Sequence, residues 1–431
     1  MTDQQEKKEK QGQQDKRDAV YALGARARQG AVRMALLSTG DKNRMLRRMA
    51  AVLREKGEGI LAKNALDVAA AKEKGMAASF VDRLTLNVSR LEDMAKGLED
   101  LAALKDPIGE ILGGWIGAQD IEITKVRVPI GVVAMIYEAR PNVTADAAGI
   151  CFKTGNAVIL RGSGEAKESN LAVVEALRQA VREEGGPEEA ILMLEDTSRE
   201  AAAELMKMNQ YLDLLIPRGG AGLIQTVMRE STVPVIETGI GNCHVYVDAS
   251  ADLAMALKIL INAKIQRPGV CNAAESLLVH SDVAAAFLPE AGKALGDLGV
   301  ELRACPESLP YLPGAKAATE EDFAAEFLDL ILSVKIVKGL DEAIEHINTY
   351  GTKHTEAIIT KDYEAARRFT SHVDAAVVMV NASTRFTDGG MFGFGAEIGI
   401  STQKLHARGP MGLEEMTSIK YIVQGEGQAR K

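Results

Sequence analysis

Cys271 is the side chain of this sequence best suited to act as a nucleophile. It follows Pro268, which cannot continue a helix, and Gly269, which loosens the backbone, and it precedes the strand-like residues 275–280. A thiol on a loop next to a strand can be presented to a substrate. The alternative is a small buried side chain, because most free cysteines pack inside the protein.

Two polar side chains upstream of Cys271 complete a set suited to acyl transfer. Glu237 directly follows the strand-like residues 233–236, and Asn142 follows the apolar residues 131–136. An amide can donate a hydrogen bond to an oxyanion, and a carboxylate can serve as a general base. For Glu237 a second interpretation stays open, that of a carboxylate retained at a strand end for structural reasons.

The composition favours a multidomain enzyme over a protein that binds nucleic acid or a membrane. The chain has 431 residues, which predicts about two or three domains. Its 51 basic and 60 acidic residues give a net charge of −9, which offers no broad attraction to nucleic acid or anionic lipid. The N-terminus has no apolar segment like that of a signal peptide, and no apolar run is long enough to span a bilayer. We therefore predict a cytoplasmic protein.

The cysteines and histidines give no sign of disulfides or of a metal site. None of the four cysteines forms a C-x-x-C pattern, so reduced thiols are expected. Cys151 and Cys243 lie beside apolar runs and are predicted to pack, whereas Cys305 lies in a polar loop. The histidines show no spacing typical of metal ligands, so no metal is predicted.

The order of the elements predicts an α/β fold. Residues 1–16 have almost no side chains to bury and are predicted to form a disordered tail, and residues 17–104 have helical spacing. Residues 121–128 alternate as in a strand with one exposed face. Apolar runs separated by helical stretches predict parallel sheets covered on both faces. These runs are residues 132–136, 157–160, 212–216, 233–236, 245–247, 277–279, 330–337, 357–359 and 376–380.

Two glycine-rich segments are candidates for binding a cofactor phosphate. Residues 161–165 and residues 218–222 each follow an apolar run and precede a helical stretch. Such turns point backbone N–H groups and a helix N-terminus toward an anion. They can equally be tight turns of an α/β fold, and the chain lacks a G-x-G-x-x-G fingerprint after an early strand.

The order of these landmarks resembles the aldehyde dehydrogenase superfamily. In that superfamily an Asn after a Pro, a strand-end Glu before a glycine-rich turn, and a loop Cys occur in this order. The segments YEARPNVTADAAGICFKTGNAVILRG, VPVIETGIGNCHVYVD and QRPGVCNAAE are similar to the branch that reduces L-glutamyl 5-phosphate. So are DLLIPRGGAGLI and the glycine-rich stretch from residue 379 to residue 415.

The resemblance implies two doubly wound parallel-sheet domains and a small antiparallel flap. Residues 17–118 and 132–238 would form the cofactor-binding domain, and residues 239–407 the catalytic domain. Residues 119–131 and 408–431 would form the oligomerisation flap, which includes the alternating C-terminal residues 418–423. A homo-oligomer, a dimer or a tetramer, is therefore expected.

The resemblance also implies the reaction. NADPH would reduce L-glutamyl 5-phosphate to L-glutamate 5-semialdehyde and phosphate through a thioester on Cys271, in the second step of proline biosynthesis from glutamate. Asn142 would donate to the oxyanion. A reductase that uses phosphate has no need of activated water, so Glu237 stays between a catalytic and a structural role. The resemblance also suggests that the protein associates with glutamate 5-kinase, the enzyme that makes the labile substrate.

The resemblance assigns residues of this sequence to the parts of the cofactor that the matching residues of the family bind. The adenosine ribose would lie near Arg161, Gly162 and Ser163, and the nicotinamide ribose near Glu326. The second turn, with Arg218, Gly219 and Gly220, would also contact the cofactor. Arg161 suits a 2′-phosphate and favours NADPH over NADH, although Glu165 next to the turn leaves the choice open.

The substrate has a carboxylate, an ammonium and a phosphate to be recognised. The loop with Ser383, Thr384 and Arg385 offers hydroxyls and a cation, and Arg140 and Arg267 are further candidates. Each Arg is at least as often part of a structural ion pair. Two rival functions remain: a hydrolytic aldehyde dehydrogenase that makes a free acid, and a catalytically silent cofactor-binding partner of a kinase.

Overall fold

The computed structural model describes residues 3–430, and the side chains of residues 1–13 and Ser79 lie outside the described part. The chain divides into two compact units. The first comprises Met1–Glu237, Phe394–Gly399 and Met411–Lys431, and the second Thr238–Gly393 and Ile400–Pro410. Each unit is described below by itself.

The first unit begins with a block of helices, as the spacing of residues 17–104 predicts. The helices are α1 (Asp3–Met34), α2 (Thr39–Glu55), α3 (Gly57–Glu73), α4 (Ala78–Leu84) and α5 (Val88–Ala103). Ser38 and Asn87 begin α2 and α5, because their side chains accept hydrogen bonds from the first-turn N–H groups. The backbone of residues 3–16 belongs to α1. The predicted disorder of residues 1–16 is not tested by that assignment and stays a prediction.

A four-stranded parallel sheet follows, with the order β5-β4-β3-β6. The strands are β3 (Val132–Tyr137), β4 (Ala157–Arg161), β5 (Ile191–Met193) and β6 (Leu214–Arg218). They alternate with α6 (Pro141–Lys153), α7 (Lys167–Glu183), α8 (Arg199–Leu205) and α9 (Ala221–Glu230). The predicted strand at residues 233–236 is reduced to one bridge between Leu215 and Val235. Pro234 lacks the N–H that a longer ladder would use.

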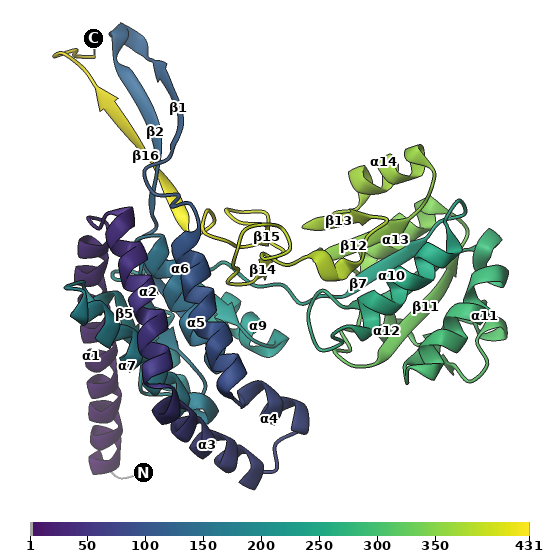
Figure 1. The fold of residues 1–431 in the computed structure, drawn as a ribbon, viewed down its shortest axis with the longest axis horizontal. Coiled ribbons are helices and arrows are strands. Elements are labelled where there is room, and N and C mark those ends of the chain that lie inside the picture. Colours follow the sequence, from purple (N-terminus) through teal and green to yellow (C-terminus); the bar gives the residue numbers. More distant parts are fainter. Residues whose placement is uncertain (1–2, 431) are drawn as a thin grey trace. The chain divides into compact units, whose positions relative to one another are not determined.

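An antiparallel sheet extends from the first unit (Figure 1). It has the order β1-β2-β16, with β1 (Ile111–Ile116), β2 (Glu122–Pro129) and β16 (Thr417–Gln424). The pairing of β2 with β16 confirms the antiparallel sheet predicted from residues 121–128 and 418–423. Strand β1 was not predicted, because Gly113 and Gly114 interrupt its apolar pattern.

The second unit contains a seven-stranded parallel sheet of order β10-β9-β11-β8-β7-β12-β13. Its strands are β7 (Cys243–Val247), β8 (Ala274–His280), β9 (Glu301–Ala304), β10 (Lys316–Ala317), β11 (Ile331–Val337), β12 (Thr355–Ile359) and β13 (Val377–Val380). Its helices are α10 (Leu253–Ile265), α11 (Ser281–Asp297), α12 (Glu320–Ala324), α13 (Leu340–Tyr350) and α14 (Tyr363–His372). A short hairpin pairs β14 (Ile400–Ser401) with β15 (Gly409–Pro410).

Both faces of this sheet are covered, as continuously apolar strands predict. Val245 and Val247 pack in one core cluster with residues of α10 and α11. Tyr246, between them in sequence, packs in another cluster with residues of α13 and α14. Because successive side chains of a strand point to opposite faces of the sheet, the residues of β7 contribute to the hydrophobic cores on both faces.

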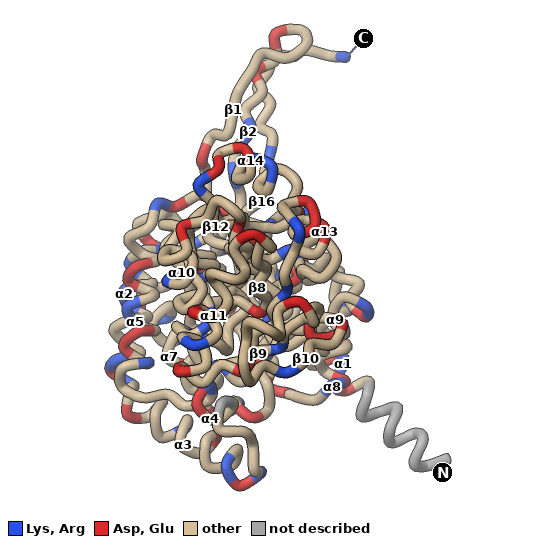
Figure 2. Tube along the Cα trace, turned by 90° about the vertical axis from the view of Figure 1, so that its right-hand side faces the viewer, with Lys and Arg blue, Asp and Glu red and all other residues tan. Residues whose placement is uncertain are grey.

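Charged side chains of the helices are paired. Figure 2 shows basic and acidic residues interspersed along α2, α5 and α7. Arg54 of α2 binds Glu92 and Glu99 of α5, and Arg48 binds Glu183 of α7. Within residues 3–430, no helix is long and apolar enough to cross a membrane.

Candidate active site

Cys271 lies on the loop between α10 and β8, and its backbone is in close contact with a glycine. A Cβ built on Gly241 would lie 1.4 Å from the carbonyl oxygen of Cys271, so residue 241 must be a glycine. The N–H of Gly241 donates to the Glu326 carboxylate at 2.6 Å. Cys271 is itself partly exposed. The loop therefore presents the thiol while its backbone is held in place.

Two buried side chains hold the peptide groups next to Cys271. The thiol of Cys243 donates to the Cys271 carbonyl oxygen at 3.2 Å, and Asn272 Nδ2 donates to the Thr387 carbonyl oxygen at 2.8 Å. Burial raises the pKa of Cys243 well above its usual value, so Cys243 remains a protonated donor. Cys243 was predicted only to pack; it is buried and also contacts the loop of Cys271.

A buried ion pair joins the two elements that flank this loop. Lys264 in the last turn of α10 lies 2.6 Å from Glu275 at the start of β8, and both side chains are fully buried. Glu275 also accepts the N–H of Leu328 at 3.1 Å. Burial lowers the pKa of Lys264 and raises that of Glu275, because each charge loses its water. The pair fixes the distance that the loop must span.

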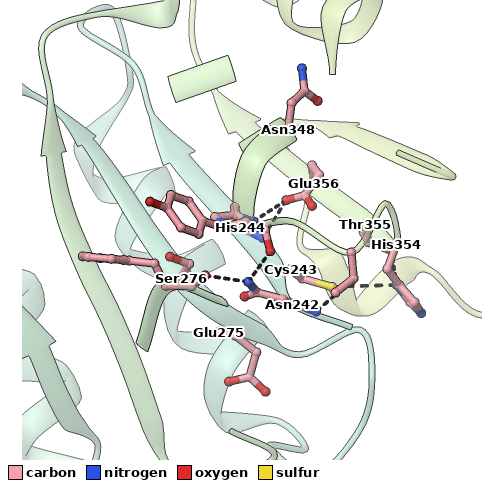
Figure 3. A network of polar contacts seen from close by, with 12 residues as sticks. Asn242, Cys243, His244, Glu275, Ser276, Asn348, His354, Thr355 and Glu356 are labelled. Carbon is pink, nitrogen blue, oxygen red and sulfur yellow. Dashed lines mark hydrogen bonds and ion pairs between the residues drawn. The ribbon is translucent and has the colours of Figure 1, made fainter. Parts of the chain in front are cut away.

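A network of polar contacts lies at the N-terminal ends of β7 and β12, next to Asn242 and Cys243 (Figure 3). Glu356 accepts hydrogen bonds from the backbone N–H of His244 at 2.8 Å and lies 2.9 Å from His244 Nδ1. Asn242 Nδ2 donates to the carbonyl oxygens of Phe323 and Tyr350 at 2.7 and 2.9 Å. These bonds make the strand ends next to Gly241 a rigid support.

Arg385 lies within electrostatic reach of Cys271, and Arg267 lies within electrostatic reach of Arg385. Burial and then repulsion from Arg267 lower the pKa of Arg385, while Cys271 and Asp388 act in the opposite direction. Arg385 Nε donates to Gln266 Oε1 at 2.7 Å. A cation near a thiol favours its thiolate, and two neighbouring arginines favour an anionic substrate.

The hydroxyls predicted to bind substrate are buried in the second unit. Ser383 Oγ accepts the N–H of Arg385 at 3.3 Å and so caps the turn that Arg385 belongs to. Thr384 is also buried. Arg385, which belongs to the same turn, interacts electrostatically with Cys271.

Asn142 belongs to the first unit and lies in the first turn of α6. Pro141 occupies an N-terminal helical position, where its missing N–H is not needed, and Arg140 precedes it as the N-cap residue. Asn142 is exposed, and its Nδ2 donates to Asp146 Oδ2 at 3.2 Å. An exposed amide at a helix N-terminus suits an oxyanion.

Glu237 is the last residue of the first unit and lies two residues after the Leu215–Val235 bridge. Its side chain is partly buried. The structure therefore places Asn142, Arg140 and Glu237 in the first unit, and Cys271, Arg267 and Arg385 in the second.

The first glycine-rich turn lies where β4 ends. Arg161 Nη2 donates to the carbonyl oxygen of Thr197 at 2.6 Å and is 3.3 Å from that of Ser198. Among the described residues, Arg161 Nε and Ser163 Oγ are buried without a hydrogen-bond partner. A Cβ on Gly162 would lie 2.1 Å from Asn170 Nδ2, so the backbone there must approach α7 closely. The turn thus holds unsatisfied polar atoms of the kind that a ligand can satisfy.

The second glycine-rich turn joins β6 to α9. Glu138 accepts the N–H of Gly220 at 3.0 Å, and a Cβ on Gly219 would lie 2.7 Å from the Glu138 carboxyl carbon. A carboxylate of the chain itself therefore lies at the N-terminus of α9. Glu326, the third predicted part of the cofactor site, lies in the second unit and not in either glycine-rich turn. Its carboxylate accepts a hydrogen bond from the backbone N–H of Gly241. Burial raises the pKa of Glu326.

The family model described as the aldehyde dehydrogenase family matches residues 3–305 and 314–422 of this chain. The chain belongs to the aldehyde dehydrogenase family. The gamma-glutamyl phosphate reductase of Heliobacterium modesticaldum is 62% identical over 407 residues, which are 94% of this chain and 98% of that protein. That of Carboxydothermus hydrogenoformans is 59% identical over 413 residues, 96% of this chain and 100% of that protein.

A crystal structure of a gamma-glutamyl phosphate reductase from Thermotoga maritima has the same fold. It aligns with a TM-score of 0.93 at 48% identity, over 96% of this chain and 100% of that chain. The family predicted from the order of motifs and the α/β fold class are therefore confirmed.

Several residues that shape the site in this family member were not singled out from the sequence. Gly241, Asn272 and the Lys264–Glu275 pair all position the loop of Cys271. One signal was present, since Lys264 and Glu275 are charges next to apolar residues at the two ends of the loop. Their pairing could not be derived, because a charged residue beside a core is more often at its exposed edge.

Proposed function

We propose that this family member reduces L-glutamyl 5-phosphate to L-glutamate 5-semialdehyde and phosphate with NADPH, in proline biosynthesis from glutamate. The observation that carries the proposal is its similarity to gamma-glutamyl phosphate reductases over nearly the whole chain, at 62% identity. The partly exposed Cys271, with Arg385 within electrostatic reach and Arg267 near Arg385, supplies the chemistry that such a reaction needs.

In this mechanism the Cys271 thiolate attacks the acyl carbon of the substrate. The bond from that carbon to the phosphate oxygen breaks, phosphate leaves, and the acyl group remains on the sulfur as a thioester. The nearby cations favour both the thiolate and the anionic substrate. We assign Arg385 and Arg267 to the phosphate or the α-carboxylate, and Arg140 to a supporting role in the first unit.

The tetrahedral species carry an oxyanion that needs donors. We assign this role to the Asn142 amide and the backbone N–H of Cys271, and one such donor typically contributes about 3 kcal/mol. Glu237 is assigned no hydrolytic step, because a base that activates water would hydrolyse the thioester.

A bound nicotinamide cofactor supplies the hydride that reduces the acyl group. The turn after β4 fits such a group, because Arg161 Nε and Ser163 Oγ are buried without partners among the described residues. We propose that Arg161, Gly162 and Ser163 hold the adenosine ribose, and that Arg161 selects NADPH over NADH. We further assign Arg218, Gly219 and Gly220 to the cofactor, and Glu326 to the nicotinamide ribose.

The proposal extends to the state of the protein in the cell. The exposed apolar residues of β16 support a homo-oligomer, a dimer or a tetramer, formed through the antiparallel flap. We propose a cytoplasmic location and an association with glutamate 5-kinase, which would protect the labile acyl phosphate from water.

One assay tests the reaction against its rivals. Reduction of NADP⁺ is followed with glutamate 5-semialdehyde as substrate, with and without inorganic phosphate. The proposed reaction requires phosphate, because phosphate is the nucleophile that releases the thioester in this direction. A rate that does not depend on phosphate would support a hydrolytic aldehyde dehydrogenase, and no rate under either condition would support a silent partner of a kinase.

A further inference from the structure

We propose that Asp146 is a positioning residue for Asn142. This inference rests on the proposed role of Asn142 as the oxyanion donor, and it adds the group that holds the amide in place. Both residues belong to α6, four positions apart, so their side chains lie on the same face of the helix. Asn142 Nδ2 lies 3.2 Å from Asp146 Oδ2.

The chemistry of an amide explains why such a partner matters. The Asn142 amide group has two N–H bonds and a carbonyl oxygen, and a free rotamer could turn either end toward the reacting carbon. A carboxylate only accepts hydrogen bonds, so Asp146 requires the nitrogen and not the oxygen on its side. One N–H is then bound to Asp146, and the direction of the second N–H is fixed for an oxyanion.

The surroundings of Asp146 favour this contact over others. Its other oxygen, Oδ1, lies toward Gly97 of α5: a Cβ built on Gly97 would be 3.9 Å from it. Burial raises the pKa of Asp146 to about 6, against the opposing effects of the Asn142 hydrogen bond and of Arg218. Arg218, at the end of β6, is the charge that acts on Asp146 among the described residues.

A double-mutant cycle in kcat tests the inference, with NADP⁺, glutamate 5-semialdehyde and phosphate as reactants. We expect Asp146→Ala to lower kcat roughly ten- to a hundredfold, since a donor that is misplaced by about 1 Å loses rate on that scale. KM for the semialdehyde should change little, because Asp146 does not touch the substrate. In an Asn142→Ala background, Asp146→Ala should have no further effect on kcat.

Two further variants separate positioning from damage to the fold. Asp146→Asn keeps an acceptor oxygen but adds N–H donors that can face Asn142 instead, so its kcat should lie between those of Asp146→Ala and the parent protein. Glu99→Ala, which removes an exposed carboxylate of α5 that is paired with Arg54, should leave kcat unchanged. Thermal melting curves of all variants should agree with that of the parent protein.

The outcomes distinguish this inference from the proposed function. If Asp146→Ala lowers kcat by the same factor with and without Asn142, or does not lower it at all, Asp146 does not act through Asn142. A kcat of Asp146→Asn no higher than that of Asp146→Ala would likewise overturn the inference. If Asn142→Ala alone keeps the parental kcat, the oxyanion role of Asn142 fails first, and the inference falls with it.

Discussion

The reactivity assigned to this protein is concentrated in one sulfur atom, and the four cysteines differ sharply in their surroundings. Cys271 is partly exposed, whereas Cys151, Cys243 and Cys305 are buried. Burial raises the pKa of Cys151 to about 12, which removes its thiolate at neutral pH. The contrast makes Cys271 the thiol to test.

Cys271→Ser should abolish turnover and leave the fold and the binding of NADP⁺ intact, because a hydroxyl is a far weaker nucleophile than a thiolate. Steady-state rates and NADP⁺ binding by calorimetry would measure both. Cys305→Ser is the matched control: Cys305 Sγ lies 3.1 Å from Ser308 Oγ, and a serine can keep this contact. Equal loss of activity in the two variants would mean that the wrong thiol has been chosen or that the loss is structural.

The choice of cofactor is assigned to Arg161. Its Nη2 is bound to the carbonyl oxygens of Thr197 and Ser198, so the side chain already has a fixed direction, while its Nε has no partner among the described residues. A guanidinium that is fixed in this way loses little entropy when it binds a phosphate.

Arg161→Leu should therefore reduce kcat/KM for NADPH more than for NADH, by roughly ten- to a hundredfold, the value of a lost charged hydrogen bond of about 1.5–3 kcal/mol. Steady-state kinetics with both cofactors measure the ratio. Arg229→Leu replaces an exposed arginine in the last turn of α9 and should leave the ratio unchanged. An unchanged ratio in Arg161→Leu would move the assignment to Ser163 and Lys167.

At the scale of the elements, the Lys264–Glu275 pair stabilises the framework around the nucleophile. Both side chains are fully buried, so removal of one leaves an unpaired charge without water. Glu275→Gln should lower the free energy of unfolding by about 3–5 kcal/mol, measured by urea denaturation with circular dichroism. The single Trp115 lies in β1, outside the second unit, so its fluorescence would not report this change.

The double variant Lys264→Met with Glu275→Leu separates charge from packing. Two apolar side chains of similar volume should recover most of the lost stability. Glu301→Gln is the control, because the Glu301–Lys316 pair is partly exposed and should contribute at most about 1 kcal/mol. A Glu275→Gln variant as stable as the parent would show that the pair does not hold the loop.

The elements also show what the sequence can and cannot predict. The long apolar runs at β3, β4, β6, β7, β8, β11, β12 and β13 were predicted as strands, because continuous burial leaves a clear pattern. The short strands β5, β9 and β10 were missed. Ile191–Met193 has only three residues and Lys316–Ala317 only two, so no periodicity can be seen in them.

The same limit applies to the site. Cys271 and Asn142 could be proposed from the sequence because their residue types and neighbours are distinctive there. Gly241 and Asp146 could not, since each depends on one contact: Gly241 with the backbone of Cys271, 30 residues away, and Asp146 with the Asn142 amide. Such contacts are set by how the strands are ordered in the sheet, which local patterns do not specify.

At the scale of the whole molecule, the antiparallel flap is the surface best suited to contact a second copy of the chain. Strands β1 and β16 form the two edges of the β1-β2-β16 sheet, and most of β16 is exposed. Ile419, Tyr421 and Val423 alternate along β16 and are 43%, 52% and 56% exposed. Tyr421 packs edge-on against Trp115 within the flap. An exposed strand edge with an apolar face is suited to pairing with a second copy of the chain.

If the chain associates through β16 as proposed, Ile419→Glu combined with Val423→Glu should dissociate that oligomer. The new carboxylates would lose their hydration in the interface and repel the same carboxylates of the second copy, at a cost of several kcal/mol. Both substitutions leave the Tyr421–Trp115 contact in place. The mass in solution, measured by sedimentation equilibrium over a range of concentrations, should fall to that of a smaller species. Leu66→Glu, at an exposed apolar position of α3, should keep the parental mass. If the flap variant also keeps it, association does not depend on β16.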